Sequence, residues 1–336
     1  FNAPSQNSFS APMNYPTQVA DYNGNSPTIP AIPIEQDELF QLDAPAMGEY
    51  VLYMPQEGEA LVDCQDRFAL NTHRGRYAIA DGVKGSFVPS AWARILARGF
   101  VEYDQDVYQT VPMMTQGQDT SGGSLYFGER TQFEQWLQQC RTSWHTWIRS
   151  RWIPAINASR MQYGESPLDW ESEIERGAQS TLTGCWLRAR NNPADPYIDV
   201  HVSVIGDSEF FLFRRDEQGA WQNVAALPFI SIDEFDTRLA ALTTRSETEQ
   251  TGYAWTLWQE GSIAALPGDR IVLATASLAQ WILMQVQQHQ MQWTTLLEST
   301  NSAFHEQMLR SEQHANRLGN GDVTMLVIPI PAPHMN

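Results

Sequence analysis

The chain has 336 residues, of which 42% are hydrophobic and 11% aromatic, a composition typical of a globular protein with one large or two ordinary domains. Its 21 basic and 39 acidic residues give a net charge of −18, which argues against a nucleic-acid groove and against docking on anionic lipid, because both need Lys and Arg. No stretch approaches the roughly 20 apolar residues of a membrane span. The N-terminus lacks the basic and apolar regions of a signal peptide.

The three cysteines, Cys64, Cys140 and Cys185, are odd in number and far apart in the sequence. They show neither a metal-ligand spacing nor a disulfide framework. Because unpaired thiols persist in reducing surroundings, this usage predicts a cytoplasmic protein.

Residues 1–46 differ in composition from the rest of the chain. The first twenty carry no charged side chain, and seven of the 19 prolines fall in this segment. Because proline excludes helix, we predict an extended Pro-rich arm or linker here, followed by one domain over 47–333. Two interpretations stay open, namely an arm that docks on another subunit through apolar anchors, and a disordered tail. The anchors are Ile32, Ile34, Leu39, Phe40 and Leu42.

Strands are predicted where apolar and polar residues alternate among β-branched and aromatic side chains. The first such runs are residues 49–54, 67–70 and 77–80. A second block comprises residues 180–190, 197–208, 209–216 and 269–276, with a final strand over 322–331. Gly206-Asp207-Ser208 is interpreted as the turn of a hairpin, and the acidic stretch 229–252 as irregular.

Helices are predicted between the two strand blocks and before the last strand. Apolar residues recur at helical spacing over 89–103 and over 130–154, where Thr131 is the expected N-cap and Pro154 is expected to break or end the helix. One or two further helices are predicted over 278–315. This order of strands, helices, strands, helices and strand predicts an α+β fold with two sheets and helices outside.

Six separated motifs occur along this framework. They read "DCQDRFAL", "AIADGVKGS", "GAQSTLTGCWL", "SVIGDSEFFLFRRD", "PGDRIVLATASLAQWI" and "GNGDVTMLVI". Each alone is a weak signal, because an Asp-Gly pair at a strand end is usually a turn. Together and in this order they resemble the metal-dependent protein phosphatase family of the protein phosphatase 2C type, over about residues 47–331. The resemblance implies a four-layer α-β-β-α sandwich of two antiparallel sheets flanked by helix pairs.

That family holds two divalent cations with carboxylates, because oxygen anions offset the repulsion between the ions, and a bridging water attacks the phosphate. The resemblance implies that Asp81 matches the aspartate that bridges both metals and that Gly82 matches the glycine whose carbonyl binds one. Asp66 matches an aspartate that lies behind the direct ligands, and Asp207 matches a turn in the second strand block.

The chain departs from the family at the other ligands. Where the family has Ser-Asp-Gly after the penultimate strand, this chain has Thr275, Ala276 and Ser277, and alanine has no side-chain oxygen. The family's last metal aspartate, three residues before a Thr or Ser, falls on Gly321 when counted back from Thr324.

Two supporting positions differ as well, since Gln65 replaces a glutamate and Leu61 stands where a phosphate-gripping arginine is usual. Each lost carboxylate removes an attraction of a few kcal/mol, using ~4 kcal/mol per unit-charge pair at 4 Å, so metal affinity is predicted to fall by several powers of ten. Asp322 lies next to the lost ligand, but a one-residue shift in a strand points a side chain to the other face. The sequence therefore predicts a degenerate pseudophosphatase without a cofactor. Mg²⁺ or Mn²⁺ is the ion expected if any metal binds.

Three functions stay open at this stage. The first is an inactive phosphatase fold that acts as a binding, scaffolding or regulatory subunit on a protein partner, such as a kinase or a multi-subunit assembly. The second is a weakly active or remodelled Ser/Thr phosphoprotein phosphatase that uses Asp66, Asp81, Asp207 and Asp322. The third is a structural subunit docked by its N-terminal arm. Lys84, near the pocket, is a candidate to neutralise Asp81.

Overall fold

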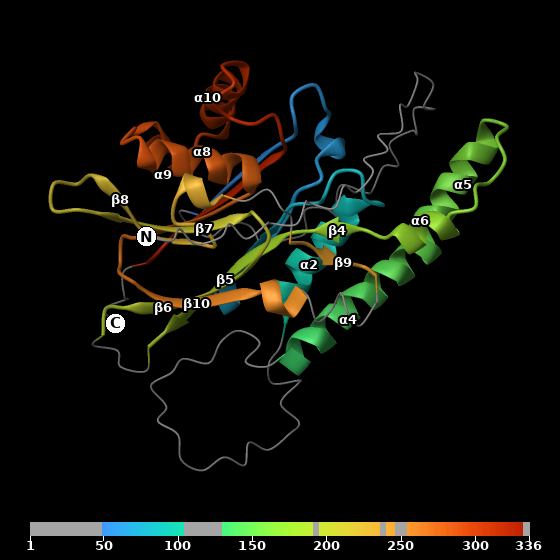
Figure 1. Cartoon of the computed structure of the whole chain (residues 1–336), viewed down its shortest axis with the longest axis horizontal. Coiled ribbons are helices and arrows are strands. Elements are labelled where there is room, and N and C mark those ends of the chain that lie inside the picture. The colour runs from blue at the N-terminus through green and yellow to red at the C-terminus, as the bar shows by residue number, and fades with distance from the viewer. Residues whose placement is uncertain (1–48, 104–129, 191–194, 236–239, 246–253, 332–336) are drawn as a thin grey trace, which may run out of the picture. The chain divides into compact units, whose positions relative to one another are not determined.

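The structure is a computed structural model, drawn in Figure 1, in which most of the chain beyond the predicted arm is described. The described residues are 49–103, 130–190, 195–235, 240–245 and 254–331. The predicted arm over 1–46 therefore lies outside the described residues. All the described residues belong to one unit, 33–336.

Two five-stranded sheets, antiparallel throughout, form the centre of this unit. The first has the order β1 (Tyr50–Met54), β12 (Val323–Pro329), β11 (Arg270–Ala274), β7 (Glu209–Arg215) and β8 (Trp221–Leu227). The second has the order β10 (Gln259–Ala265), β6 (Ile198–Ile205), β5 (Leu182–Ala189), β3 (Arg76–Ala80) and β2 (Arg67–Asn71). A short pair joins β4 (Gln179–Ser180) to β9 (Leu242–Thr243).

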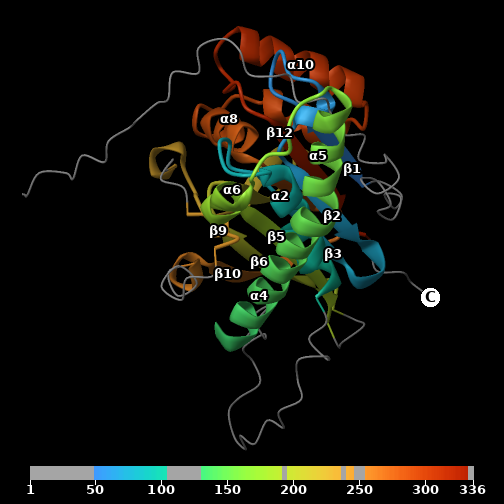
Figure 2. The same ribbon diagram turned by 90° about the vertical axis from the view of Figure 1, so that its right-hand side faces the viewer.

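Helices cover the outer face of each sheet (Figure 2). The first sheet packs against α8 (Ala276–Gln287), α9 (Thr295–Glu298) and α10 (Ser302–His314). The second packs against α2 (Pro89–Glu102) and α4 (Arg130–Trp147). The chain continues from α4 through a π-helical turn (Ile148–Trp152) into α5 (Ile153–Gln162), and α6 (Glu171–Arg176) follows.

Side-chain alternation along β3 explains how the layers meet. Ile79 and Tyr77 point to the other sheet and join a core of residues from both sheets, whereas Ala78 and Ala80 face α2. The small alanines let the helix approach the sheet closely. The predicted α+β class, with two antiparallel sheets flanked by helices, is confirmed.

The segment Gly206-Asp207-Ser208 is not the turn of a hairpin, so that prediction is wrong. It connects β6 in the second sheet to β7 in the first, and these two strands pair with other partners. The glycine has φ +103°, which allows the sharp change of direction between the sheets. The sequence did not separate the two arrangements because a Gly-Asp-Ser segment between two strands suits a hairpin turn and a connection between sheets equally well.

The prediction that Pro154 breaks or ends the second helix is confirmed in part, because α4 ends at Trp147 and a π-helical turn precedes the proline, but the chain does not leave the helical conformation. The helical run continues to Gln162, because the π-helical turn before the proline bonds the N–H of Ile153 to the carbonyl of Ile148. Pro154 then occupies the first turn of α5, where its missing N–H costs no hydrogen bond. Thr131 is not the N-cap of α4, because Arg130 is already helical and Thr131 therefore lies inside the helix.

Strands β8 and β10 were missed by the sequence analysis, since neither shows clear alternation of apolar and polar residues. Each is an edge strand and is only partly buried. Within the residues that the structure describes, no helix combines the length and the apolar character needed to span a membrane.

Candidate functional site

Four carboxylates gather at one end of the two sheets. Asp66 precedes β2 and Asp81 follows β3, and these strands run antiparallel, so both residues lie at the same edge of the second sheet. Asp207 lies in the connection between the sheets, and Asp322 immediately precedes β12. Repulsion from Asp322 acts on both Asp66 and Asp81, which places the three charges in one electrostatic cluster.

Asp66 is fully buried and is held by the opposite sheet. Thr275, directly after β11, donates its hydroxyl to Asp66 Oδ2 over 2.9 Å. Asp66 also shares a side-chain hydrogen bond with Asp81. Burial, followed by the negative charge of Asp322, raises the pKa of Asp66 to about 7. The charged form of this carboxyl group is therefore disfavoured relative to that of an exposed aspartate.

The main chain of Asp81 is fixed by the segment that leads into β5. Its carbonyl accepts hydrogen bonds from Ser180 Oγ at 2.8 Å and from the N–H of Thr181 at 2.9 Å. Burial, followed by the charges of Asp66 and Asp207, raises the pKa of Asp81 well above its usual value. Two neighbouring carboxyl groups with raised pKa values retain protons unless a cation offsets their charge.

Gly82 has a packing requirement that is independent of any metal. A Cβ atom at this position would lie 2.8 Å from the carbonyl oxygen of Gln65 and 3.0 Å from Cβ of Pro89, the first residue of α2. Both neighbours belong to constrained backbone, so neither yields easily.

Asp207 is almost completely buried, and its Oδ1 has no hydrogen-bond partner in the described part of the chain. Burial raises the pKa of this carboxyl group. The next residue, Ser208, shares a 2.8 Å hydrogen bond with the Thr181 hydroxyl. Thr181 therefore supports both Asp81 and the connection that carries Asp207, a role that the sequence analysis did not find.

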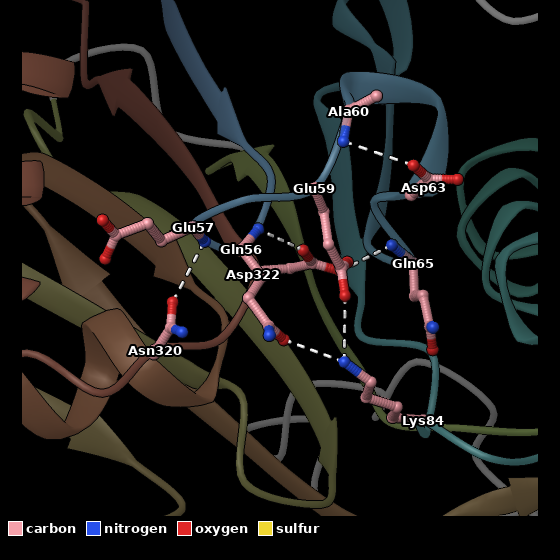
Figure 3. A network of polar contacts seen from close by, with 9 residues as sticks. All are labelled: Gln56, Glu57, Glu59, Ala60, Asp63, Gln65, Lys84, Asn320 and Asp322. Atoms are coloured by element: carbon pink, nitrogen blue, oxygen red, sulfur yellow. Dashed lines mark hydrogen bonds and ion pairs between the residues drawn. The ribbon is translucent and has the colours of Figure 1, made fainter. Parts of the chain in front are cut away.

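Both carboxylate oxygens of Asp322 accept hydrogen bonds from backbone N–H groups of the loop between β1 and β2 (Figure 3). Its Oδ1 accepts the N–H of Gln56 at 2.7 Å, and its Oδ2 accepts the N–H of Gln65 at 2.6 Å. These partners are 266 and 257 residues away in the sequence. The side chain proposed as a substitute ligand is thus engaged with the loop between β1 and β2.

The positions matching the two lost ligands lie beside each other. Ala276 is the first residue of α8 and carries no side-chain oxygen. A Cβ atom built on Gly321 would lie 2.5 Å from Ser277 Oγ. A side chain at position 321 would therefore require the Ser277 hydroxyl to rotate away, and this serine stands where the resemblance places a glycine.

The remaining predicted residues lie at the rim of the acidic cluster. Leu61, at the position of the phosphate-gripping arginine, is 51% exposed. Lys84 donates to Gln56 Oε1 and to Glu59 Oε1, each at 3.0 Å, and is mostly exposed (Figure 3). These contacts place its ammonium group with Glu59, in contrast to the expected pairing with Asp81.

The residues present do not fit a two-metal centre. Ala276 and Gly321 offer no side-chain oxygen, and Asp322 is bound to two backbone N–H groups. Among the described residues, no group of three or more His, Cys, Asp or Glu side chains is arranged to hold a metal ion.

No family model and no curated protein matches the sequence. Among solved structures, the chain is similar to the catalytic domain of the serine/threonine protein phosphatase PstP in complex with two manganese ions, at 16% identity and a TM-score of 0.46, covering 84% of this chain and 97% of that one. It is also similar to the photosystem II phosphatase PBCP, at 12% identity and a TM-score of 0.46, covering 84% and 98%. A third similar structure is the serine/threonine phosphatase of S. agalactiae, at 13% identity and a TM-score of 0.42, covering 84% and 99%.

Proposed function

We propose that this chain is a phosphatase-like protein that has lost its two-metal centre and acts as a binding, scaffolding or regulatory subunit through protein contacts. The residues at positions 276 and 321 carry this proposal, because neither Ala276 nor Gly321 has a side-chain oxygen where the resemblance places metal-binding aspartates. The sheets, the carboxyl groups of Asp66 and Asp81 and the helices around them are retained. A framework that is kept without its metal ligands is suited to binding and unsuited to metal-assisted hydrolysis.

The proposal is tested by titrating Mn²⁺ and Mg²⁺ into the purified protein in a calorimeter, with Asp81→Asn as the control. We expect no binding heat at millimolar metal for either protein. Micromolar binding that disappears in Asp81→Asn would overturn the proposal. A matched positive variant, Ala276→Asp/Ser277→Gly/Gly321→Asp, returns both carboxylates and removes the obstructing hydroxyl. We expect it to bind Mn²⁺ when its thermal unfolding shows that it folds.

A remodelled metal-dependent Ser/Thr phosphoprotein phosphatase is the second candidate. The observation in its favour is that Asp207 Oδ1 is buried and has no hydrogen-bond partner among the described residues. Metal binding by the wild-type protein, together with Mn²⁺-dependent hydrolysis of a phosphoserine peptide that Asp66→Asn abolishes, would favour this candidate over the first.

The partner is proposed to be a protein, such as a kinase or a multi-subunit assembly. A chain with a net charge of −18 favours a basic surface on that partner. The arm over 1–46 supports the related proposal of a docked structural subunit through its apolar residues. Deletion of this segment distinguishes the two, because only docking by the arm requires it for co-purification with the partner.

The proposed location is the cytoplasm. All three cysteines are buried and free, with no disulfide between them. This agrees with a reducing compartment. Fractionation of cells that express a tagged chain tests the location directly.

A further inference from the structure

The loop over 55–65, between β1 and β2, has few ties of its own to the core. Five of its residues are exposed, Leu61 among them, and Cys64 is the buried apolar side chain at its end. Within the loop, the N–H groups of Asp63 and Cys64 bond to nearby carbonyls of the same segment. The loop therefore depends on side chains from elsewhere for its attachment.

Asp322 supplies the attachment at both ends of this loop (Figure 3). Gln56 lies near its start and Gln65 at its end, and each donates its N–H to one oxygen of the same carboxylate. Hydrogen bonds to a charged acceptor are about twice as strong as neutral ones. The Asp322 side chain thus ties both ends of the segment 56–65 to the residue that precedes β12.

Arg67 also holds the end of the loop, because its Nη1 donates to the carbonyl of Cys64 at 2.6 Å. The remaining ties of the loop are weaker. Asn320 accepts the N–H of Glu57 at 3.0 Å, and the side chain of Glu57 contacts His314 Nε2 at 2.7 Å. The side chains of His314 and Lys84 are 65% and 64% exposed. Ion pairs of exposed side chains contribute little to stability because water screens them.

We propose that Asp322 is a latch for the loop over 55–65, and that this loop opens as a unit and exposes Cys64 when the latch is removed. In the closed state, burial raises the pKa of the Cys64 thiol, followed by the charge of Asp66, so the thiol is unreactive. Opening returns Cys64 to water. Local opening of a weakly attached segment needs less free energy than unfolding of the core. This inference goes beyond the proposed function, because it concerns the attachment of the loop and not catalysis.

The three buried cysteines provide the test. Cys64 ends the loop, whereas Cys140 lies in α4 and Cys185 in β5, and both core thiols are fully enclosed. The full chain is labelled with iodoacetamide in buffer that contains a chelator, and the rate at each cysteine is measured by mass spectrometry of its peptide. In Asp322→Ala we expect labelling of Cys64 to be at least tenfold faster than in wild type, with Cys140 and Cys185 unchanged.

A matched control is Asp63→Ala, which removes a carboxylate that caps only Ala60 within the same loop. It is expected to label like wild type. An unchanged rate at Cys64 in Asp322→Ala would overturn the latch. If that variant unfolds, Asp322→Asn, which keeps size and shape, replaces it. Selective acceleration at Cys64 then supports the latch, and equal acceleration at all three cysteines contradicts it. The chelator separates this result from metal binding, so the proposed function can fail without the latch failing.

Discussion

The hydroxyl of Thr275 donates to Asp66 Oδ2 over 2.9 Å and accepts the N–H of Thr324 over 2.9 Å. Asp66 enters the second sheet and Thr275 leaves the first, so one hydroxyl joins the two sheets at the acidic cluster. All three residues are fully buried. The loss of this hydroxyl leaves both a buried donor and a buried carboxylate without a partner.

Replacement of Thr275 by valine, which keeps the shape and removes the hydroxyl, is therefore expected to destabilise the protein by about 1–3 kcal/mol. Urea unfolding followed by tryptophan fluorescence measures the change. Thr275→Ser keeps the hydroxyl and should retain most of the stability. A valine variant as stable as wild type would show that Asp66 does not need this donor.

Gly321→Ala is expected to destabilise by about 0.5–1.5 kcal/mol, because its Cβ would lie 2.5 Å from Ser277 Oγ and the serine side chain must leave its rotamer. Adding Ser277→Ala removes that oxygen and should recover most of the loss, which a double-mutant cycle measures as a coupling energy. Gly319→Ala is the matched control, since its Cβ would meet the same oxygen at 3.5 Å, an ordinary contact. Equal effects at the two glycines would contradict the steric explanation.

Gly82→Ala is expected to destabilise by about 1–3 kcal/mol in the presence of a chelator, because its Cβ would press on the backbone of Gln65 and on Pro89. The comparison variant is Gly261→Ala, whose Cβ would meet only Leu227 Cδ2 at 3.8 Å. Thermal unfolding of both variants in metal-free buffer is the measurement. A neutral Gly82→Ala would remove the packing requirement and leave metal binding as the reason for this glycine.

The stability of the protein is expected to depend on pH through Glu312. Its carboxylate accepts hydrogen bonds from Nε and Nη2 of Arg317, each at 2.8 Å. The hydrogen bond from Arg317 lowers the pKa of Glu312 below its usual value of 4.5. A depressed carboxyl pKa in the folded state contributes stability above the unfolded pKa, and this contribution is lost as pH falls through the folded value.

Glu312→Gln should therefore lower the free energy of unfolding by about 1–2 kcal/mol at neutral pH. This range allows for solvent screening, because the Arg317 side chain is 53% exposed. The difference between the variant and wild type should become smaller as the pH falls below 4.5. Urea midpoints at several pH values provide the measurement. Glu306→Gln, at an exposed and longer ion pair on the same helix, should change little at any pH. A cost that does not shrink in acid would assign the effect to packing.

Much of the fold followed from the sequence because buried strands such as β3 and β7 and the apolar stripe of α4 carry strong local patterns. The edge strand β10 was missed because its polar and small residues, "QEGSIAA", carry no such pattern. The continuation of the helix past Pro154 was not predicted, because the π-helical turn that moves the hydrogen bond of Ile153 to the carbonyl of Ile148 has no sequence pattern of its own.

The candidate site was predictable only in part. The grouping of Asp66 with Asp81 follows from two antiparallel strands that are adjacent in the sequence. The engagement of Asp322 depends on backbone N–H groups more than 250 residues away, and the contact of Ser277 with Gly321 depends on how α8 meets the loop before β12. No local pattern encodes such contacts.

The proximity of Ser277 to Gly321 also couples the effects of substitutions at these two positions. An aspartate introduced first at position 321 meets the Ser277 hydroxyl, and a glycine introduced first at position 277 brings no ligand with it. A third change at Ala276 is needed before a second carboxylate is available. The effect of a substitution at position 321 thus depends on the residue at position 277, so the two positions are expected to change together.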